Sequence, residues 1–316
     1  MAGDGAPMNR VVILGGYGAV GREVVAGLRG HVREIVVAGR DLEKARTVEG
    51  AAPLRIDLRS DDAEDLDAAL LGADAVVMCA ETGNARVAER CLRRGVHYVD
   101  VSASYEVLSA IEELDGLAAG AGATAVLSVG LAPGVTNLLA RGFGGAGTEI
   151  GVLIGAGDRH GPSAVDWTLD SLGGIGESWR MRFPPPYGVR TVHRFPFSDQ
   201  YTLPGRVRTG LCLDSRALTA ALPRLRRFRG SAPVRAVFRH VHLGGDGFAV
   251  AAASGGRVRS FAGRRQSRAT GLATALVVRL LDGAPRGVRH IEDVAGPGFL
   301  PELAAHGFAL DEYDAR

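Results

Sequence analysis

Short apolar runs alternate with amphipathic segments through the first 130 residues of the chain. Runs rich in Val, Ile and Leu predict six strands, at residues 11–14, 34–38, 53–57, 75–79, 97–101 and 124–129. Between them, segments such as 20–28 place apolar residues three and four positions apart, which indicates helices that pack by one face. Strands separated by helices are typical of a parallel sheet. We therefore predict an α/β fold, a Rossmann-type doubly wound parallel sheet, over residues 8–130.

The pattern changes after residue 130, where Gly and Pro separate longer strand-like runs: 149–156, 188–195, 207–213, 248–254 and 257–262. The last two runs flank Gly255 and Gly256 and predict an antiparallel hairpin. We therefore predict an inserted α+β substrate and dimerisation domain over 131–262. Segment 267–281 predicts a helix, and we expect residues 263–316 to return to the dinucleotide-binding domain.

A glycine-rich turn follows the first predicted strand and opens the first predicted helix. It places GxGxxG on Gly16, Gly18 and Gly21, in the context that a dinucleotide-binding fingerprint requires. The glycines permit a tight turn, close approach of the pyrophosphate and close packing of helix on strand. The alternative is a turn that binds nothing. We predict that the cofactor-binding residues here are Gly15, Gly16, Tyr17, Gly18, Ala19, Val20 and Gly21.

The end of the second predicted strand indicates which nucleotide binds. An NAD site carries Asp or Glu there to accept the ribose hydroxyls, whereas this chain has Ala38, Gly39 and Arg40. Gly39 leaves room for a 2′-phosphate, and Arg40 can bind it through a bidentate pair of charge-assisted hydrogen bonds. We therefore predict NADP (NADPH) rather than NAD. The alternative is that Arg40 is a solvated loop residue and Asp41 binds the ribose.

Ligands of such sheets bind at the carboxyl ends of the strands. Asp57 ends the third predicted strand and is a candidate for the adenine amino group. Four more candidate cofactor residues follow the fourth and fifth strands: Cys79, Ala80, Asp100 and Ser102. The alternative at each of these positions is an ordinary loop residue.

The composition excludes several classes of protein. Lys44 is the only lysine, and its context is unsuitable for a pyridoxal phosphate, Schiff-base or P-loop enzyme. Three cysteines are too few for a disulfide framework or a zinc site, and His240 and His242 are predicted surface residues. The net charge is only +2, so the arginine-rich segments 224–229 and 257–268 are interpreted as solvated faces rather than as a nucleic-acid site. With no signal peptide and no long apolar run, we expect no membrane contact and a cytoplasmic location.

The remaining residues limit the chemistry of hydride transfer. A short-chain reductase needs Tyr and Lys four residues apart, but Arg40 stands four before Lys44. The histidines and cysteines also supply no zinc-ligand pattern. Hydride transfer to an electrophile that needs little acid assistance is still possible. A protonated imine is such an electrophile, because its nitrogen already carries the charge.

Four motifs together resemble the saccharopine dehydrogenase (saccharopine reductase) family: GGYGAVG from Gly15, AGR from Ala38, GVHYVD from Gly95 and GLAPGVTN from Gly130. The resemblance runs through residues 10–140 and resumes near 265. It implies an NADP-dependent oxidoreductase with an inserted substrate domain, often dimeric, that reduces imines formed from amino acids or polyamines, or runs the reverse reaction. The family commonly has Asp where this chain has Ala132, which favours a relative with another substrate, in secondary metabolism.

Substrate residues are expected in the second domain and in the segment that leads to it. An aromatic, arginine-bearing stretch fits a small organic substrate that carries a carboxylate. Pro133 is placed as the first residue of a helix, whose N-terminus favours such a carboxylate. The candidates are Asn137, Trp167, Arg180 and Tyr201, with Tyr105 as a weak catalytic candidate. The alternatives are aromatic residues of a core or dimer interface, and an Asn137 that only caps or packs.

These observations predict an NADP-dependent oxidoreductase that transfers hydride to or from the C=N bond of an amino-acid-derived substrate. We expect a homodimer that binds a small molecule. The alternatives are a non-catalytic NADP-binding sensor or scaffold and a redox-neutral or enoyl-reducing relative.

Overall fold

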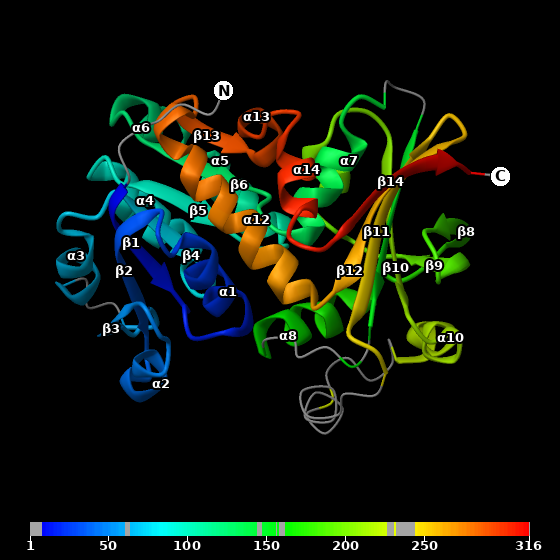
Figure 1. Cartoon of the computed structure of the whole chain (residues 1–316), viewed down its shortest axis with the longest axis horizontal. Helices are drawn as coiled ribbons and strands as arrows, with labels where there is room; N and C mark the ends of the chain where they lie inside the picture. The colour runs from blue at the N-terminus through cyan, green and yellow to red at the C-terminus, as the bar shows by residue number, and fades with distance from the viewer. Residues whose placement is uncertain are drawn as a thin grey trace. The chain divides into compact units, whose positions relative to one another are not determined.

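The computed structural model describes residues 8–60, 64–143, 147–155, 157, 162–225, 231 and 244–315 (Figure 1). The chain divides into two compact units. Unit 1 comprises Met1–Ser102, Glu106–Gly130 and Thr270–Gly296, and unit 2 comprises Ala103–Tyr105, Leu131–Ala269 and Pro297–Arg316.

Unit 1 is built on a seven-stranded sheet in which every pair of neighbouring strands is parallel. Its strands, in spatial order, are β13 (Gly287–His290), β6 (Thr124–Leu127), β5 (His97–Asp100), β4 (Ala75–Met78), β1 (Met8–Leu14), β2 (Val32–Gly39) and β3 (Ala52–Arg55). The helices between them are α1 (Ala19–Leu28), α2 (Leu42–Arg46), α3 (Glu64–Leu70), α4 (Asn84–Arg93), α5 (Tyr105–Glu112) and α6 (Asp115–Gly120). The predicted Rossmann-type fold is confirmed.

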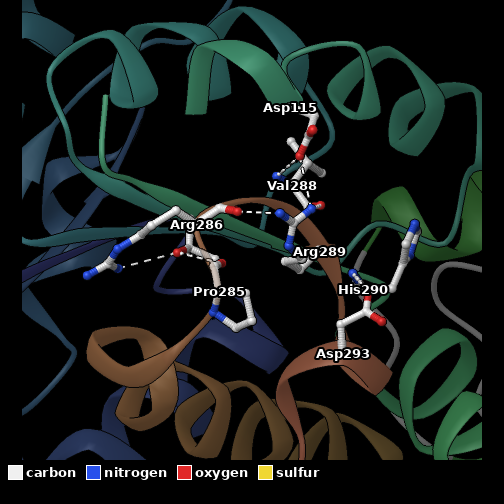
Figure 2. A network of polar contacts seen from close by, with 8 residues as sticks. Asp115, Pro285, Arg286, Val288, Arg289, His290 and Asp293 are labelled. Carbon is white, nitrogen blue, oxygen red and sulfur yellow. Dashed lines mark hydrogen bonds and ion pairs between the residues drawn. The ribbon is translucent and has the colours of Figure 1, made fainter. Parts of the chain in front are cut away.

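Strand β13 is absent from the sequence prediction, because Val288 is the only large apolar residue in it. The orange strand lies beside β6 in Figure 1, with Gly287 paired to Thr124 and His290 to Leu127. Asp115 anchors it: one carboxylate oxygen accepts from the Val288 amide at 2.9 Å and from the Arg289 guanidinium at 3.0 Å (Figure 2). Polar contacts therefore hold a strand that hydrophobic patterning does not reveal.

Helix α12 (Gln266–Leu280) packs on α1 within unit 1 through close backbone approach. A Cβ on Gly27 would lie 2.7 Å from the Ala275 Cβ, and one on Gly271 would lie 2.9 Å from the Val20 carbonyl oxygen. Small residues are therefore required where the two helices meet.

Unit 2 is built on a second seven-stranded sheet, in which only β7 and β10 pair in parallel. The spatial order is β14 (Ala309–Asp314), β12 (Arg257–Arg264), β11 (Gly247–Ser254), β7 (Thr148–Ile154), β10 (Val207–Leu213), β9 (Gly188–Arg194) and β8 (Ser178–Phe183). Its helices include α7 (Thr136–Ala140), α8 (Pro162–Ser171), α9 (Asp199–Thr202) and α10 (Arg216–Leu225). The predicted hairpin is present as β11 and β12, and an α+β fold is observed.

Residues 263–316 are expected to return to the first domain, but the last twenty of them do not. The segment that includes β13 and α13 (Ile291–Val294) belongs to unit 1, but Pro297–Arg316 belongs to unit 2. There β14 covers the edge of β12, with Leu310 paired to Phe261. The alternating, mostly exposed residues of β14 carry too little apolar signal to predict an edge strand from the sequence.

Candidate functional site

The glycine turn between β1 and α1 is tightly bound to its neighbours by backbone hydrogen bonds. Gly15 adopts a φ of +77°, which favours glycine, and its amide donates to the Ala38 carbonyl at 2.8 Å. The Gly18 amide donates to the Gly15 carbonyl at 2.9 Å, and α1 begins at Ala19. The turn therefore presents the first helical residues, Ala19 and Val20, at the carboxyl end of β1.

The three fingerprint glycines differ in what surrounds them. A Cβ on Gly21 would lie 2.5 Å from the Gly16 Cα, and one on Gly16 would lie 2.9 Å from the Ile13 carbonyl oxygen. Neither position has room for a side chain. A Cβ on Gly18 would meet only the Gly15 carbonyl oxygen, at 3.2 Å. Gly18 therefore borders open space, as close approach of a pyrophosphate requires.

Strands β4 and β2 flank β1, so the turn has a neighbour on each side. A Cβ on Gly15 would lie 3.0 Å from the Cys79 carbonyl oxygen and 3.2 Å from the Ala80 Cβ, after β4. On the other side the Tyr17 ring lies against Gly39, at the end of β2, closer than a Cβ there would allow. The structure thus brings the predicted residues of the turn, of β2 and of β4 together.

A pocket of about 490 Å³ opens beside Tyr17, at the carboxyl ends of β2 and β3. Its lining contains four cations and two carboxylates: Arg40, Lys44, Arg55 and Arg59, with Asp41 and Glu43. Asp41 is the N-cap of α2 and accepts from the Lys44 amide at 3.1 Å. Its carboxylate therefore already has a structural partner, which disfavours the alternative in which Asp41 binds the ribose.

Asp57 lies just beyond β3 and is bound by Arg59. The guanidinium donates to Oδ1 at 3.0 Å and to Oδ2 at 2.7 Å. These hydrogen bonds from Arg59, and the charge of Arg40, hold the pKa of the Asp57 carboxyl well below its usual value. The predicted adenine contact of Asp57 is still a proposal. Sequence reasoning missed Arg55, which lies within the predicted strand 53–57, and Arg59, which follows the end of that strand.

Asp100 ends β5, but its side chain is fully buried and is directed inward. Oδ2 accepts from the Tyr98 hydroxyl at 2.6 Å and from Asn84 Nδ2 at 2.9 Å, and Oδ1 accepts from the Ser102 amide at 2.7 Å. Asn84 Nδ2 also contacts the Ala80 carbonyl at 3.3 Å. The Asp100 side chain is therefore bonded within the protein, and its place in the cofactor site stays a prediction. The carboxylate connects the ends of β4 and β5.

Burial also raises the pKa of two side chains at this end of the sheet, Asp100 and Cys79. Desolvation raises the pKa of the Asp100 carboxyl, although its three hydrogen bonds oppose that shift. Desolvation, with a smaller effect of the Asp100 charge, raises the pKa of the Cys79 thiol to about 12. Cys79 is therefore a neutral thiol at physiological pH and is a poor nucleophile.

Two of the predicted substrate residues, Tyr201 and Asn137, have close contacts within unit 2, and the partner of Tyr201 is the weak catalytic candidate Tyr105. Tyr105 and Tyr201 stack, with ring centroids 4.7 Å apart. Asn137 Nδ2 lies 3.4 Å from the Thr202 hydroxyl, next to Tyr201 in the sequence. Tyr201 is 54% exposed, so the stacked pair has an open side that a flat or apolar ligand can contact.

The other two predicted substrate residues are Trp167, which packs against aromatic rings, and Arg180, which lies on an edge strand. Trp167 contacts Phe195 and Phe197, with ring centroids 5.5 and 5.8 Å away, as expected of a core aromatic. Arg180 is exposed on the edge strand β8, on the face opposite the buried Met181. Its role as a substrate residue stays a prediction.

The segment before α7 differs from the expected helix start. Ala132 has φ −150° and ψ 106°, and Gly134 has φ 128°, so Pro133 does not begin a helix. The helix begins at Thr136, and Asn137 Oδ1 accepts from the Gly134 amide at 3.0 Å. Asn137 is fully buried. It therefore holds the turn in place, as the capping alternative predicts, and its contact with a substrate stays a prediction.

Several other predictions concern charged surfaces. In segment 257–268, Arg257 and Arg259 both pair with Glu312. His240, His242 and the arginines from 226 to 229 lie outside the described residues.

The described helices lack the length and apolar character that a bilayer crossing requires. The described residues also contain no group of three or more His, Cys, Asp or Glu placed to hold a metal.

Residues 11–126 match the family model of the saccharopine dehydrogenase NADP binding domain. This match confirms the resemblance that the sequence motifs indicate, and it confirms NADP as the expected cofactor of unit 1. Among curated proteins, none matches the chain.

One solved structure supports the fold over nearly the whole chain. Apo saccharopine dehydrogenase (L-Glu forming) from Saccharomyces cerevisiae aligns with a TM-score of 0.63 and 16% identity, covering 98% of this chain and 100% of that one. A dehydrogenase from Clostridium difficile aligns with a TM-score of 0.40 and 10% identity over 80% and 78% of the two chains. A short-chain type dehydrogenase/reductase from Mycobacterium ulcerans has values of 0.31 and 20% over 38% and 66%.

Proposed function

We propose that this chain, in which residues 11–126 are a saccharopine dehydrogenase-type NADP-binding domain, is an NADP-dependent oxidoreductase that transfers hydride to or from the C=N bond of an amino-acid-derived substrate. The observation that carries the proposal is the order of features along the sheet. The glycine turn of β1 lies between the basic pocket after β2 and the ends of β4 and β5. A dinucleotide with its pyrophosphate on the turn extends its adenosine phosphate over β2 and its nicotinamide over β4.

The nicotinamide side of this arrangement favours an imine over a carbonyl. Cys79 is a neutral thiol with a pKa raised to about 12, and the Asp100 carboxylate is fully buried. Neither can deliver a proton readily to a developing alkoxide. A protonated imine needs no such donor, because its nitrogen loses its charge as hydride arrives at carbon. Positioning then supplies most of the rate acceleration.

The stacked Tyr105 and Tyr201 are the candidate substrate contacts of unit 2. If Tyr105 only orients substrate, Tyr105→Phe lowers kcat by no more than ~100-fold, which is the lower limit of the ~10²–10⁴-fold that a general acid contributes. Loss of all turnover, with NADPH binding intact, would identify an obligatory proton donor and favour carbonyl or enoyl reduction.

NADPH oxidation tests the proposal directly. The purified chain is incubated with NADPH and mixtures of an amino acid and a 2-oxo acid or aldehyde, from which imines form in solution. We expect NADPH absorbance to fall only when both components are present, and borohydride-reduced imine to inhibit. Turnover with the carbonyl compound alone would contradict imine chemistry. Tight NADPH binding without turnover in any mixture would instead support the non-catalytic alternative.

A further inference from the structure

We propose that Arg55 is a second arm of the 2′-phosphate site and, with Arg40, determines the preference for NADP over NAD. The inference rests on the proposed nucleotide site. It adds a residue that lies outside both the glycine fingerprint and the segment after β2.

The backbone places the two arginines side by side at adjacent strand ends. In the parallel pairing of β2 and β3, Arg55 is the register partner of Gly39, and Arg40 follows Gly39 directly. The Ile56 amide donates to the Gly39 carbonyl at 3.0 Å, which extends the pairing past Arg55. Both side chains are exposed and line the pocket beside Tyr17. Two guanidinium groups therefore line one pocket from the ends of two neighbouring strands.

The pocket contains two kinds of cation. Lys44 is 3.4 Å from the Asp41 carboxylate, and Arg59 holds Asp57 through two hydrogen bonds. In the part of the chain that the structure describes, the side chains of Arg40 and Arg55 form no ion pair within 4.0 Å and no hydrogen bond, although the charge of Arg40 acts on Asp57 from farther away. These two can therefore bind an incoming anion without first breaking an internal ion pair.

A phosphate monoester dianion is the ligand that two such groups suit. Each guanidinium presents a planar fork of N–H donors that matches phosphate oxygens, and two forks offset both charges. The pocket's volume of about 490 Å³ lies within the usual range of small-molecule sites. NAD has a hydroxyl where NADP has this phosphate, so the pair discriminates between the two nucleotides.

Fluorescence titration of the full chain with NADPH and NADH tests the proposal. We expect Arg55→Ala to weaken NADPH binding by about 10- to 100-fold, the range of a lost charged hydrogen bond. NADH binding should change by less than about 2-fold, because the ribose hydroxyl makes no ionic contact. Arg55→Lys should recover part of the loss, since it keeps the charge without the fork. Adenosine 2′-phosphate should displace NADPH from the parent more readily than adenosine 5′-phosphate does.

The matched control is Arg33→Ala. Arg33 is an exposed arginine of β2 that does not line the pocket, so both nucleotides should bind as they do to the parent. An Arg55→Ala variant that keeps the parent's ratio of NADPH to NADH affinity would overturn the inference. A parent chain that binds neither nucleotide would instead contradict the proposed function, so the two failures are distinguishable.

Discussion

The hydroxyl oxygen of Ser128 lies 2.8 Å from Nδ1 of His290. The other ring nitrogen lies 3.2 Å from a Glu112 carboxylate oxygen. Serine, histidine and a carboxylate are the residue types of acyl-transfer triads, in which serine contacts Nε2. Here serine contacts Nδ1 and is fully buried, so it is inaccessible to a substrate. The three residues instead connect the end of α5, the exit of β6 and the end of β13.

Ser128 should contribute to stability in two opposing ways. Ser128→Ala removes the partner of a half-buried ring nitrogen, and we expect it to lower the free energy of unfolding by about 1–3 kcal/mol. Ser128 has a φ of +56°, a conformation that glycine adopts more easily. Ser128→Gly should therefore be more stable than Ser128→Ala in urea unfolding of the same chain. Equal stability of the two variants would show that the backbone there is unstrained.

Two glycine substitutions separate binding from folding. Gly18→Val should abolish nucleotide binding while the fold survives, because a Cβ there meets only one atom, at 3.2 Å. Gly21→Ala should instead impair folding, because its Cβ would lie 2.5 Å from the Gly16 Cα. Circular dichroism and NADPH titration of both variants make the comparison. A folded Gly18→Val that binds NADPH normally would mean that the pyrophosphate lies elsewhere.

Arg40 should act on one nucleotide only. Arg40→Ala should cost about 1.5–3 kcal/mol of NADPH binding, the value of a charged hydrogen bond, and leave NADH unaffected. Parallel titrations measure both affinities. Equal affinity of the parent for NADPH and NADH would refute the assignment.

Asp100 gives the stability of unit 1 a pH dependence of known sign. Its pKa is raised above the ordinary 3.8 by burial, so the folded chain keeps the proton to a higher pH than the unfolded chain does. Its contribution to stability therefore falls as pH rises from 3.8 to the folded pKa, and is constant above it.

Asp100→Asn removes that titration and retains a similar shape. Urea unfolding of both proteins across the acidic range should give a stability difference that shifts in favour of the parent as pH falls through this window. A difference that stays constant with pH would place the Asp100 pKa at its unfolded value.

The sequence predicts the part of the fold that rests on local hydrophobic patterning. The buried strands β1, β2 and β4 are β-branched runs, and Gly16, Gly18 and Gly21 stand where the turn needs them. The Arg40 prediction follows from an absent carboxylate, which is also a local signal. These features could be predicted because one short segment determines each of them.

Other features depend on residues far apart in the chain. The direction of the Asp100 carboxylate depends on Asn84 and Tyr98, which no spacing rule connects to it. The sequence predicts that a helix starts at Pro133, but Gly134 has a positive φ and the helix begins only at Thr136. Arg55 becomes visible only when β2 and β3 pair, since 15 positions separate it from Arg40.

The late position of β13 in the chain affects biosynthesis. Until residues 287–290 leave the ribosome, β6 is an edge strand whose four residues are all fully buried in the finished sheet. A nascent chain at that stage presents unpaired backbone groups and apolar side chains, the conditions under which strands from different molecules associate. The Asp115 contacts to β13 then close this edge, so a ribosome-stalled chain that stops before residue 287 should recruit chaperones that the full chain no longer binds.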